Sequence, residues 1–335
     1  MADKRSPLRL LIYISPLILF AVSLYLGTYR IPLPGLFKTL LSPLVPAWKA
    51  GLPEGYSSIV FGIRLPRLIL ALAVGSALSI SGASLQALFK NPLVNEYILG
   101  LSSGAGFGAS LSLVFLGPAF PPQISAFFFA VAAVLMVLSI SSRSESPIVS
   151  LLLTGVIVSA FFTALLSLVE FFASPYSLQA LFNWLMGNLA RPGWKDLAVT
   201  LPFVLGGGGV LILLRWRLNV LSLSDDEARS LGVNLRGEKL LVIALATLIT
   251  AAATAAAGII GWIGLIVPHL VRMMAGADNR RVVPLSAALG ASFLLLADDI
   301  ARSLASFEVP VGIFTSIIGI PLFILLLRKS SKVWP

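Results

Sequence analysis

Long apolar stretches separated by short polar connections follow one another along almost the whole chain. Each has about 20 residues and few charges, which is the length that an α-helix needs to cross the hydrocarbon core of a bilayer. The predicted spans are residues 8–29, 59–88, 93–116, 123–142, 148–170, 196–215, 239–257, 259–274, 283–305 and 310–328. The pattern therefore predicts an all-α polytopic membrane protein with about ten transmembrane helices, which form a single transmembrane domain over residues 1–335.

Two segments depart from this simple pattern. The eighth predicted span is short and contains Gly264 and Pro268. Interrupted helices of this kind are tolerated where protein or a water-filled cavity surrounds them. Residues 177–187, between the fifth and sixth spans, are amphipathic and predict a short interfacial helix.

The composition supports the membrane class. Of 335 residues, 58% are hydrophobic and 11% are charged, and the mean hydropathy is +0.97. Soluble domains carry about 25% charged residues, so the chain does not fit that class. Cysteine is absent, which excludes disulfides and thiolate chemistry.

The distribution of charge predicts the orientation in the membrane. An even number of spans puts both termini on one side. With the N-terminus inside, 16 of the 24 Lys and Arg residues fall on inner segments. The eight outer ones are Arg30, Lys38, Lys49, Arg64, Arg67, Arg191, Lys195 and Arg302. This bias places both termini in the cytoplasm, and the predicted location is the cell inner membrane. The same bias explains the net charge of +10 without a nucleic-acid partner.

A short charged helix interrupts the apolar pattern at LSLSDDEARSLGV, residues 221–233. Ser224 and Glu227 have the spacing of a capping box, and Asp225 and Asp226 place negative charge in the first turn, where the helix dipole favours it. Gly232 is a typical helix end. Two helical turns are too short to be stable alone, so this segment, in the longest inner loop, is predicted to dock on a soluble cytoplasmic partner.

Several charges lie in or near the apolar spans. Asp298 and Asp299 precede Arg302 by four and three residues, so either carboxylate can pair with the guanidinium along one helix face. A structural ion pair is one interpretation, a proton or ion relay is a second, and a surface role in which Arg302 grips a partner is a third. Arg64 and Arg67, in RLPR at the outer start of the second span, run against the positive-inside trend. They either extend to lipid headgroups or form an electrostatic socket for an acidic external partner.

Enzyme chemistry finds little support. No G-x-x-x-x-G-K-[ST] phosphate loop occurs, so the chain has no ATPase motif of its own. His269 is the only histidine and has no acid or Cys near it in sequence, so neither a metal site nor a catalytic site is predicted. A transport protein is favoured, and an ion-coupled secondary transporter and a membrane-embedded enzyme remain as alternatives.

Three long blocks in order carry a family resemblance. They are RLPRLILALAVGSALSISGASLQALFKNPLVNEYILGLSSGAGFGA, GIIGWIGLIVPHLVRMMAGADNRRVVPLSAALGASFLLLADDIARSL and VPVGIFTSIIGIPLFILLLRK. From about residue 60 onward the chain resembles the FecCD or BtuC permease subunits of type II ABC importers. The resemblance implies a BtuC-like bundle whose homodimer surrounds a path for iron–siderophores, haem, cobalamin or related metal chelates. It also implies two cytoplasmic ATPase subunits, which bind the ATP and Mg²⁺, and one external substrate-binding protein.

The resemblance also implies roles for particular residues. Arg64, Arg67 and Arg302 match family arginines that pair with acidic residues of the binding protein. The coupling helix that seats in the ATPase corresponds to residues 224–232, with Ser224, Asp225, Asp226, Glu227, Ala228, Arg229, Leu231 and Gly232. The family's cytoplasmic gate corresponds to SESPIVSLLLTG, with Pro147, Ile148, Val149 and Ser150. Apolar residues replace part of the more polar pattern of the cobalamin importer, which argues against cobalamin in particular.

Overall fold

The computed structural model describes residues 6–27, 29–117, 120–142, 147–190, 193–304 and 309–330, and all regular structure within them is helical. The α-helices are α1 (Ser6–Tyr25), α2 (Leu33–Leu41), α3 (Glu54–Ser57), α4 (Leu65–Phe89), α5 (Leu101–Leu111), α6 (Pro122–Ser141), α7 (Pro147–Phe172), α8 (Pro175–Leu185), α9 (Trp194–Leu213), α10 (Arg215–Leu221), α11 (Asp225–Ser230), α12 (Leu235–Ala257), α13 (Ile263–Ala275), α14 (Asn279–Ser303) and α15 (Val311–Ser330). A 3₁₀ turn covers Pro46–Gly51, and π-helical turns cover Ser58–Arg64 and Ser112–Leu116.

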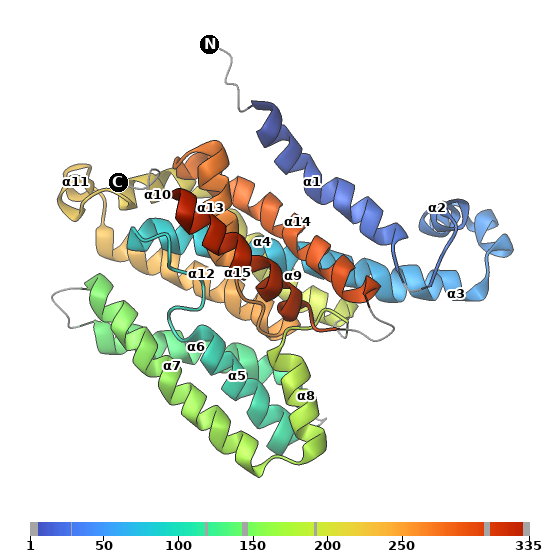
Figure 1. The fold of residues 1–335 in the computed structure, drawn as a ribbon, viewed down its shortest axis with the longest axis horizontal. Helices are drawn as coiled ribbons and strands as arrows, with labels where there is room; N and C mark the ends of the chain where they lie inside the picture. The colour runs from blue at the N-terminus through green and yellow to red at the C-terminus, as the bar shows by residue number, and fades with distance from the viewer. Residues whose placement is uncertain are drawn as a thin grey trace.

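Helix α4 forms the centre of the bundle and is buried along nearly its whole length (Figure 1). Helices α1, α9, α12, α13 and α14 pack around it. Two glycines on α4 allow this close packing. A Cβ atom at Gly75 would lie 2.3 Å from the carbonyl oxygen of Gly290 on α14, and one at Gly82 would lie 2.0 Å from that of Gly264 on α13. The small residues therefore let backbones meet directly, as is common between membrane helices.

A second group of helices, α5 to α8, lies beside this bundle (Figure 1). Helix α5 packs closely on α6 because Gly104 and Gly108 face the backbone of that helix. Cβ atoms at these positions would lie 2.4 Å from the carbonyl oxygen of Phe129 and 2.3 Å from that of Ser125. Helix α7 packs against α5 and α6 and leaves one long face exposed.

The observed helices correspond to the ten predicted spans. Within the part of the chain that the structure describes, seven helices are long and apolar enough to cross a membrane by length and composition, and three shorter apolar helices cover Leu101–Leu116, Ile263–Ala275 and Val311–Leu326. The prediction of an all-α, multi-pass membrane fold is thus confirmed.

The predicted span 93–116 was too long at its N-terminal end. Residues 90–100 leave the α-helical path, because Lys90 and Gly100 adopt left-handed backbone conformations (φ of 53° and 79°) on either side of a segment that turns at Pro92 and Leu93 and again at residues 96–99. The chain then enters α5 at Leu101. Periodicity alone missed this irregular segment because its residues are as apolar as those of a helix.

The two ends of the bundle are distinct. Helix α11 lies at one end of the long axis, and helices α2 and α3 lie at the other (Figure 1). The predicted orientation assigns the α11 end to the cytoplasm and the α2 end to the outside.

Candidate functional site

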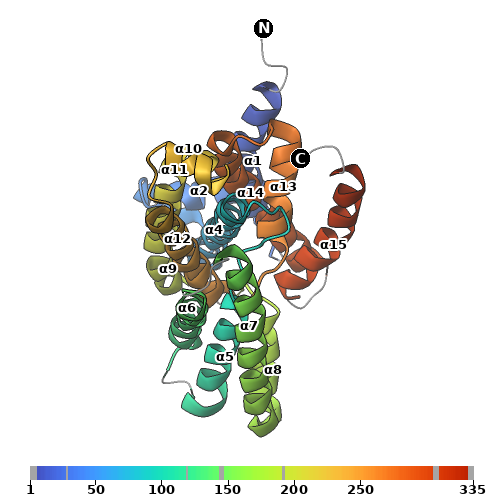
Figure 2. The ribbon, with the colours of Figure 1, turned by 90° about the vertical axis from the view of Figure 1, so that its left-hand side faces the viewer.

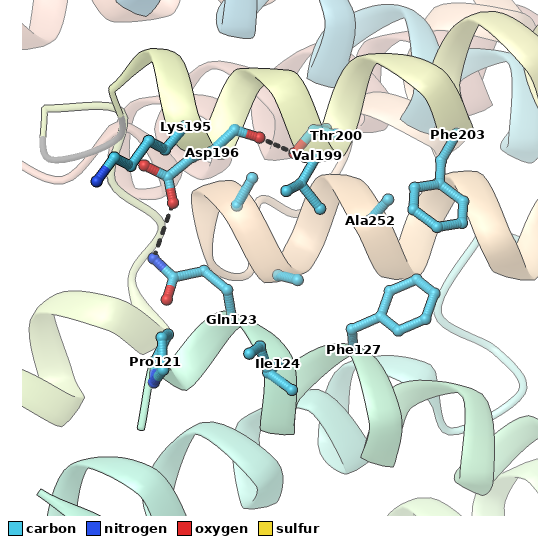
Figure 3. Close-up of a pocket in the computed structure, with 12 residues that line it drawn as sticks. Pro121, Gln123, Ile124, Phe127, Lys195, Asp196, Val199, Thr200, Phe203 and Ala252 are labelled. Atoms are coloured by element: carbon cyan, nitrogen blue, oxygen red, sulfur yellow. Dashed lines mark hydrogen bonds between the residues drawn. The ribbon is translucent and has the colours of Figure 1, made fainter. Parts of the chain in front are cut away.

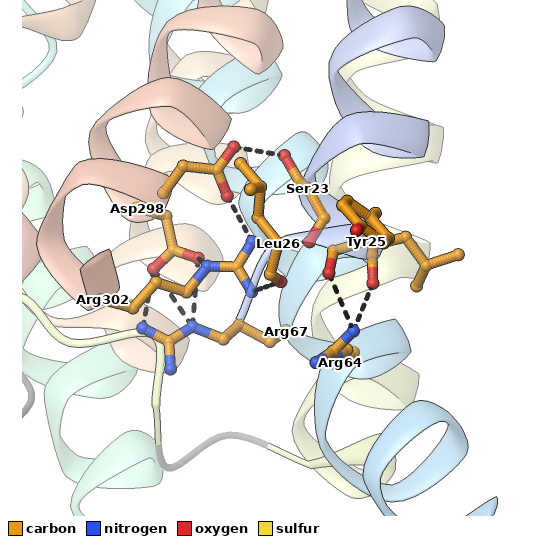
Figure 4. Close-up of polar contacts among 9 residues, drawn as sticks. Ser23, Tyr25, Leu26, Arg64, Arg67, Asp298 and Arg302 are labelled. Carbon is orange, nitrogen blue, oxygen red and sulfur yellow. Dashed lines mark hydrogen bonds and ion pairs between the residues drawn. The ribbon is translucent and has the colours of Figure 1, made fainter. Parts of the chain in front are cut away.

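A charged cluster of five buried residues joins α1, α4 and α14 (Figure 4). Its members are Arg64, Arg67, Asp298, Asp299 and Arg302. Arg67 on α4 binds Asp298 on α14 through three short contacts: Nε lies 3.1 Å from each carboxylate oxygen, and Nη2 lies 2.8 Å from Oδ1. Asp298 is fully buried and Arg67 is 7% exposed. This pairing could not be foreseen from the sequence, because it joins residues far apart in the chain.

Arg302 lies on the other side of the same carboxylate. Its Nε is 3.7 Å from Asp298 Oδ2, and its Nη2 donates to Asp299. Asp299 also accepts a 2.6 Å hydrogen bond from the Ser23 hydroxyl on α1. The structure therefore brings together Asp298, Asp299 and Arg302, as the sequence spacing suggested, and adds Arg67.

The C-terminus of α1 supplies further acceptors to this cluster. Arg302 donates to the carbonyl oxygens of Ser23 and Leu26, at 2.7 and 3.1 Å. Arg64 donates to the carbonyl oxygen of Leu24 at 2.6 Å and also to Tyr25 and Tyr29. The last carbonyl groups of a helix lack intrahelical partners and carry partial negative charge, so two guanidinium groups suit this position.

These contacts bear on the docking prediction, which stays a prediction. Arg64, Arg67 and Arg302 were expected as outer cations available to an external protein, but their side chains are 4%, 7% and 8% exposed. Buried charges are costly without partners, and here the partners come from the chain itself. A polar cavity of about 470 Å³ nevertheless reaches Arg302, and the exposed Arg30 also lines it.

The predicted coupling helix is present as α11, at the opposite end of the bundle. The Ser224 hydroxyl accepts from the amide of Glu227 at 3.3 Å, and the Ser224 amide donates to the Glu227 carboxylate at 2.9 Å. These two bonds form the capping box, and the hydrogen bonds from Ser224 lower the pKa of Glu227. Gly232 follows the helix with a φ of 76°.

Helix α11 has an inner and an outer side. Ala228 is fully buried against the rest of the chain. Asp225 binds Lys239 on α12 at 2.9 Å and Lys90 at 3.4 Å, and the hydrogen bond from Lys239 lowers the pKa of Asp225. Other residues of the predicted coupling set face outward: Asp226 forms a loose exposed pair with Arg229 at 4.0 Å, and Leu231 is 62% exposed. Among the predicted coupling residues, Ala228 and Asp225 therefore hold the helix on the bundle, while Leu231 is available to a partner.

The predicted gate lies at the N-terminal end of α7, which begins at Pro147. The side chains of Pro147 and Ile148, and the residues 143–146 before them, lie outside the described part of the structure. Val149 is 57% exposed and Ser150 is half-buried. The gate assignment stays a prediction.

Glu96 is a buried acid that the sequence analysis missed. Its side chain is 2% exposed, and neither carboxylate oxygen has a hydrogen-bond partner among the described residues. The carboxylate packs against Gly264, where an added Cβ would lie 1.8 Å from Oε2. An acidic residue inside an apolar run was the available signal. Within the described residues no group of three or more His, Cys, Asp or Glu side chains could hold a metal ion.

Comparisons with known proteins place this architecture in a family. The model of the FecCD transport family matches residues 15–329. The chain belongs to the FecCD transport family. Its members are permease subunits of ABC transporters, in which a separate subunit hydrolyses ATP, so the prediction of a transport subunit rather than an enzyme is confirmed. The family assignment also decides against an ion-coupled secondary transporter.

Relatives whose names give different cargoes are about equally similar to this chain in sequence. The "Probable iron chelatin transport system permease protein" of Helicobacter pylori is 41% identical over 83% of this chain and 84% of its own length. The molybdate import system permease protein MolB of Haemophilus influenzae is 37% identical over 93% of this chain and 92% of its own length. A solved structure, "An inward-facing conformation of a putative metal-chelate type ABC transporter", aligns with a TM-score of 0.85 and 35% identity, over 97% of this chain and 99% of that one.

Proposed function

We propose that this FecCD-family permease imports a metal chelate, such as an iron–siderophore complex or haem. Support comes from the iron chelatin relative in Helicobacter pylori and from the structural likeness to a metal-chelate type transporter. The chain would be a single permease domain that pairs with a second copy to surround the path. The start of α7, with Pro147 to Ser150, would form the cytoplasmic gate.

Cargo competition tests this choice. The binding protein that acts with this chain would be incubated with ferric siderophores, haem and molybdate, and the bound ligand identified by mass spectrometry. Retention of a chelate or haem supports the proposal. Selective retention of molybdate, which the Haemophilus relative imports, would contradict it.

Helix α11 is the observation that supports ATP-driven coupling most directly. A capped helix held at the end of the bundle by Asp225, with Leu231 facing outward, suits a rigid contact with a moving partner. We infer that two cytoplasmic ATPase subunits, carrying ATP and Mg²⁺, receive α11 from the two copies. Both termini would then lie in the cytoplasm and the protein in the cell inner membrane, among membrane lipids.

A substitution at the exposed face of α11 tests this inference. Leu231→Asp should abolish co-purification with the ATPase and stimulation of ATP hydrolysis, because an apolar contact is replaced by a charge. Arg236→Ala, at an exposed position on the first turn of α12, serves as the control. Normal stimulation of the ATPase by a correctly inserted Leu231→Asp variant would disprove coupling through this face.

The external partner is inferred at the other end of the bundle. The cavity that Arg30 and Arg302 line is large enough for an acidic side chain, and the exposed Arg30 supplies a positive charge beside the internally paired Arg302. We infer that a substrate-binding protein places a carboxylate there, while Arg64 and Arg67 hold the surrounding helices in place. Arg30→Glu should slow association and reduce its dependence on salt, whereas Lys38→Glu on α2 should not. Equal association rates of wild type and Arg30→Glu, measured by surface plasmon resonance, would exclude this contact.

A further inference from the structure

An apolar groove lies on the flank of the molecule formed by α6, α9 and α12 (Figure 3). Its volume is about 370 Å³. Ile124 and Phe127 on α6 form one wall, and Val199 and Phe203 on α9 form the other. The rings of Phe127 and Phe203 lie 5.3 Å apart and narrow one end. The groove is therefore a slot that runs along the helices.

Small residues of α12 form the floor of this slot. Ala252, Ala255 and Ala256 line it, and their spacing places them on one helix face. Larger side chains there would fill the space between α6 and α9. The combination of apolar walls and a small-residue floor suits a narrow apolar chain rather than a polar solute.

The other end of the slot is polar and lies at the start of α9 (Figure 3). Lys195 stands exposed there, and among the described residues it forms no ion pair within 4.0 Å. The nearby Asp196 is engaged inside the chain, since it accepts from Gln123 Nε2 at 3.2 Å and from the Gly193 amide at 2.9 Å. The polar end of the slot, called its mouth below, thus offers the Lys195 cation to a ligand, while the adjacent Asp196 carboxylate is hydrogen-bonded within the chain.

The surroundings of the slot have the character of a lipid-facing surface. Ile124, Val199 and Leu205 are 55%, 66% and 68% exposed. Trp194, the first residue of α9 and the neighbour of Lys195 in the chain, is half exposed and donates its indole N–H to the Phe61 carbonyl at 2.7 Å. Tryptophan is enriched at the level of lipid headgroups, so the mouth lies where a phosphate would be. Helices α6 and α9 also lie on the flank away from α15 (Figure 2).

We propose that this slot binds one acyl chain of an anionic phospholipid, whose phosphate pairs with Lys195. The acyl chain lies between α6 and α9 on the alanine floor, with its end toward Phe127 and Phe203. This lipid stabilises the contact between the two helix groups of the fold. The site is independent of the cargo and of the ATPase.

Lipid binding by the purified full-length chain tests the proposal. The delipidated protein in detergent is titrated with phosphatidylglycerol or with zwitterionic phosphatidylcholine, and bound lipid is measured by native mass spectrometry. Lys195→Gln should weaken phosphatidylglycerol binding about fivefold and leave phosphatidylcholine unchanged, since one basic side chain near a phosphate has about this effect. Ile124→Trp fills the slot from its exposed rim and should weaken binding of both lipids.

Two control variants match these changes outside the slot. Lys38→Gln removes an exposed outer charge on α2, and Leu205→Trp enlarges an exposed apolar residue on α9 that does not line the slot. Both should bind lipid as the wild type does. The proposal is overturned if Lys195→Gln binds phosphatidylglycerol normally, if Lys38→Gln loses as much affinity, or if Ile124→Trp disrupts a dimer without changing lipid binding.

Discussion

Arg67 and Asp298 lie 231 positions apart in the chain and form a buried ion pair, with Nη2 and Oδ1 2.8 Å apart. The pair joins α4 at the centre of the bundle to α14, which packs along much of its length. Arg302 and Asp299 extend it to α1. The cluster is thus a polar junction of three helices inside an otherwise apolar assembly.

Removing one member of this junction should be costly. Asp298→Leu leaves the Arg67 guanidinium without its main carboxylate, and we expect a loss of about 3–5 kcal/mol in the free energy of unfolding. The double variant Arg67→Met, Asp298→Leu should lose less than the single one, because no uncompensated charge remains at Arg67. Thermal unfolding in detergent measures both. Asp226→Asn breaks an exposed pair and should change stability by less than about 1 kcal/mol.

Removing the charge of Glu96, by contrast, should not lower the free energy of unfolding. Its carboxylate is buried, and neither oxygen has a hydrogen-bond partner among the residues that the structure describes, so a charge there is a cost to folding. Glu96→Gln keeps the size and removes the charge, and it should be as stable as the wild type or more so. A destabilisation of more than about 1 kcal/mol would show that the carboxylate has an essential partner.

Close glycine contacts predict a sharp contrast between two substitutions. Gly82→Ala places a Cβ 2.0 Å from the Gly264 carbonyl oxygen, so α4 and α13 must separate. We expect poor folding or a loss of several kcal/mol, in line with overpacked cores. Gly209→Ala, on α9, has no atom within 4 Å of the new Cβ and should be tolerated. Expression and thermal stability of the two variants measure the difference, and equal stability would contradict the close contact.

The tether of α11 should not depend on pH in the physiological range. The pKa of Asp225 in the folded protein lies below its ordinary value of about 3.9. The ion pairs with Lys239 and Lys90 are therefore fully present above about pH 4 and are lost only as the pH falls through the lowered pKa. Hydrogen exchange of residues 225–231 should be equally protected at pH 6 and pH 8, after correction for the intrinsic rate. Lys239→Met should reduce this protection by a small amount, because the pair is partly exposed.

Much of this molecule could be predicted from local sequence. The apolar stretches indicated the helices, and the Ser224–Glu227 spacing indicated the capping box of α11. Contacts between distant helices could not be predicted in this way. The pairing of Arg67 with Asp298 depends on how α4 meets α14, and the burial of Ala228 depends on how α11 rests on the bundle. The run Gly206–Gly209 shows the same limit, since Gly207 packs closely on Ile249 while Gly206 and Gly209 face open space.

ATP-driven transport through this permease is tested most directly by uptake into proteoliposomes. The chain and its ATPase would be reconstituted together, with ATP inside or outside as the orientation requires and the loaded binding protein on the opposite side. We predict that uptake of the bound chelate stops when ATP is withheld and continues when an uncoupler collapses the proton gradient. Uptake that continues without ATP and stops with the uncoupler would contradict this account.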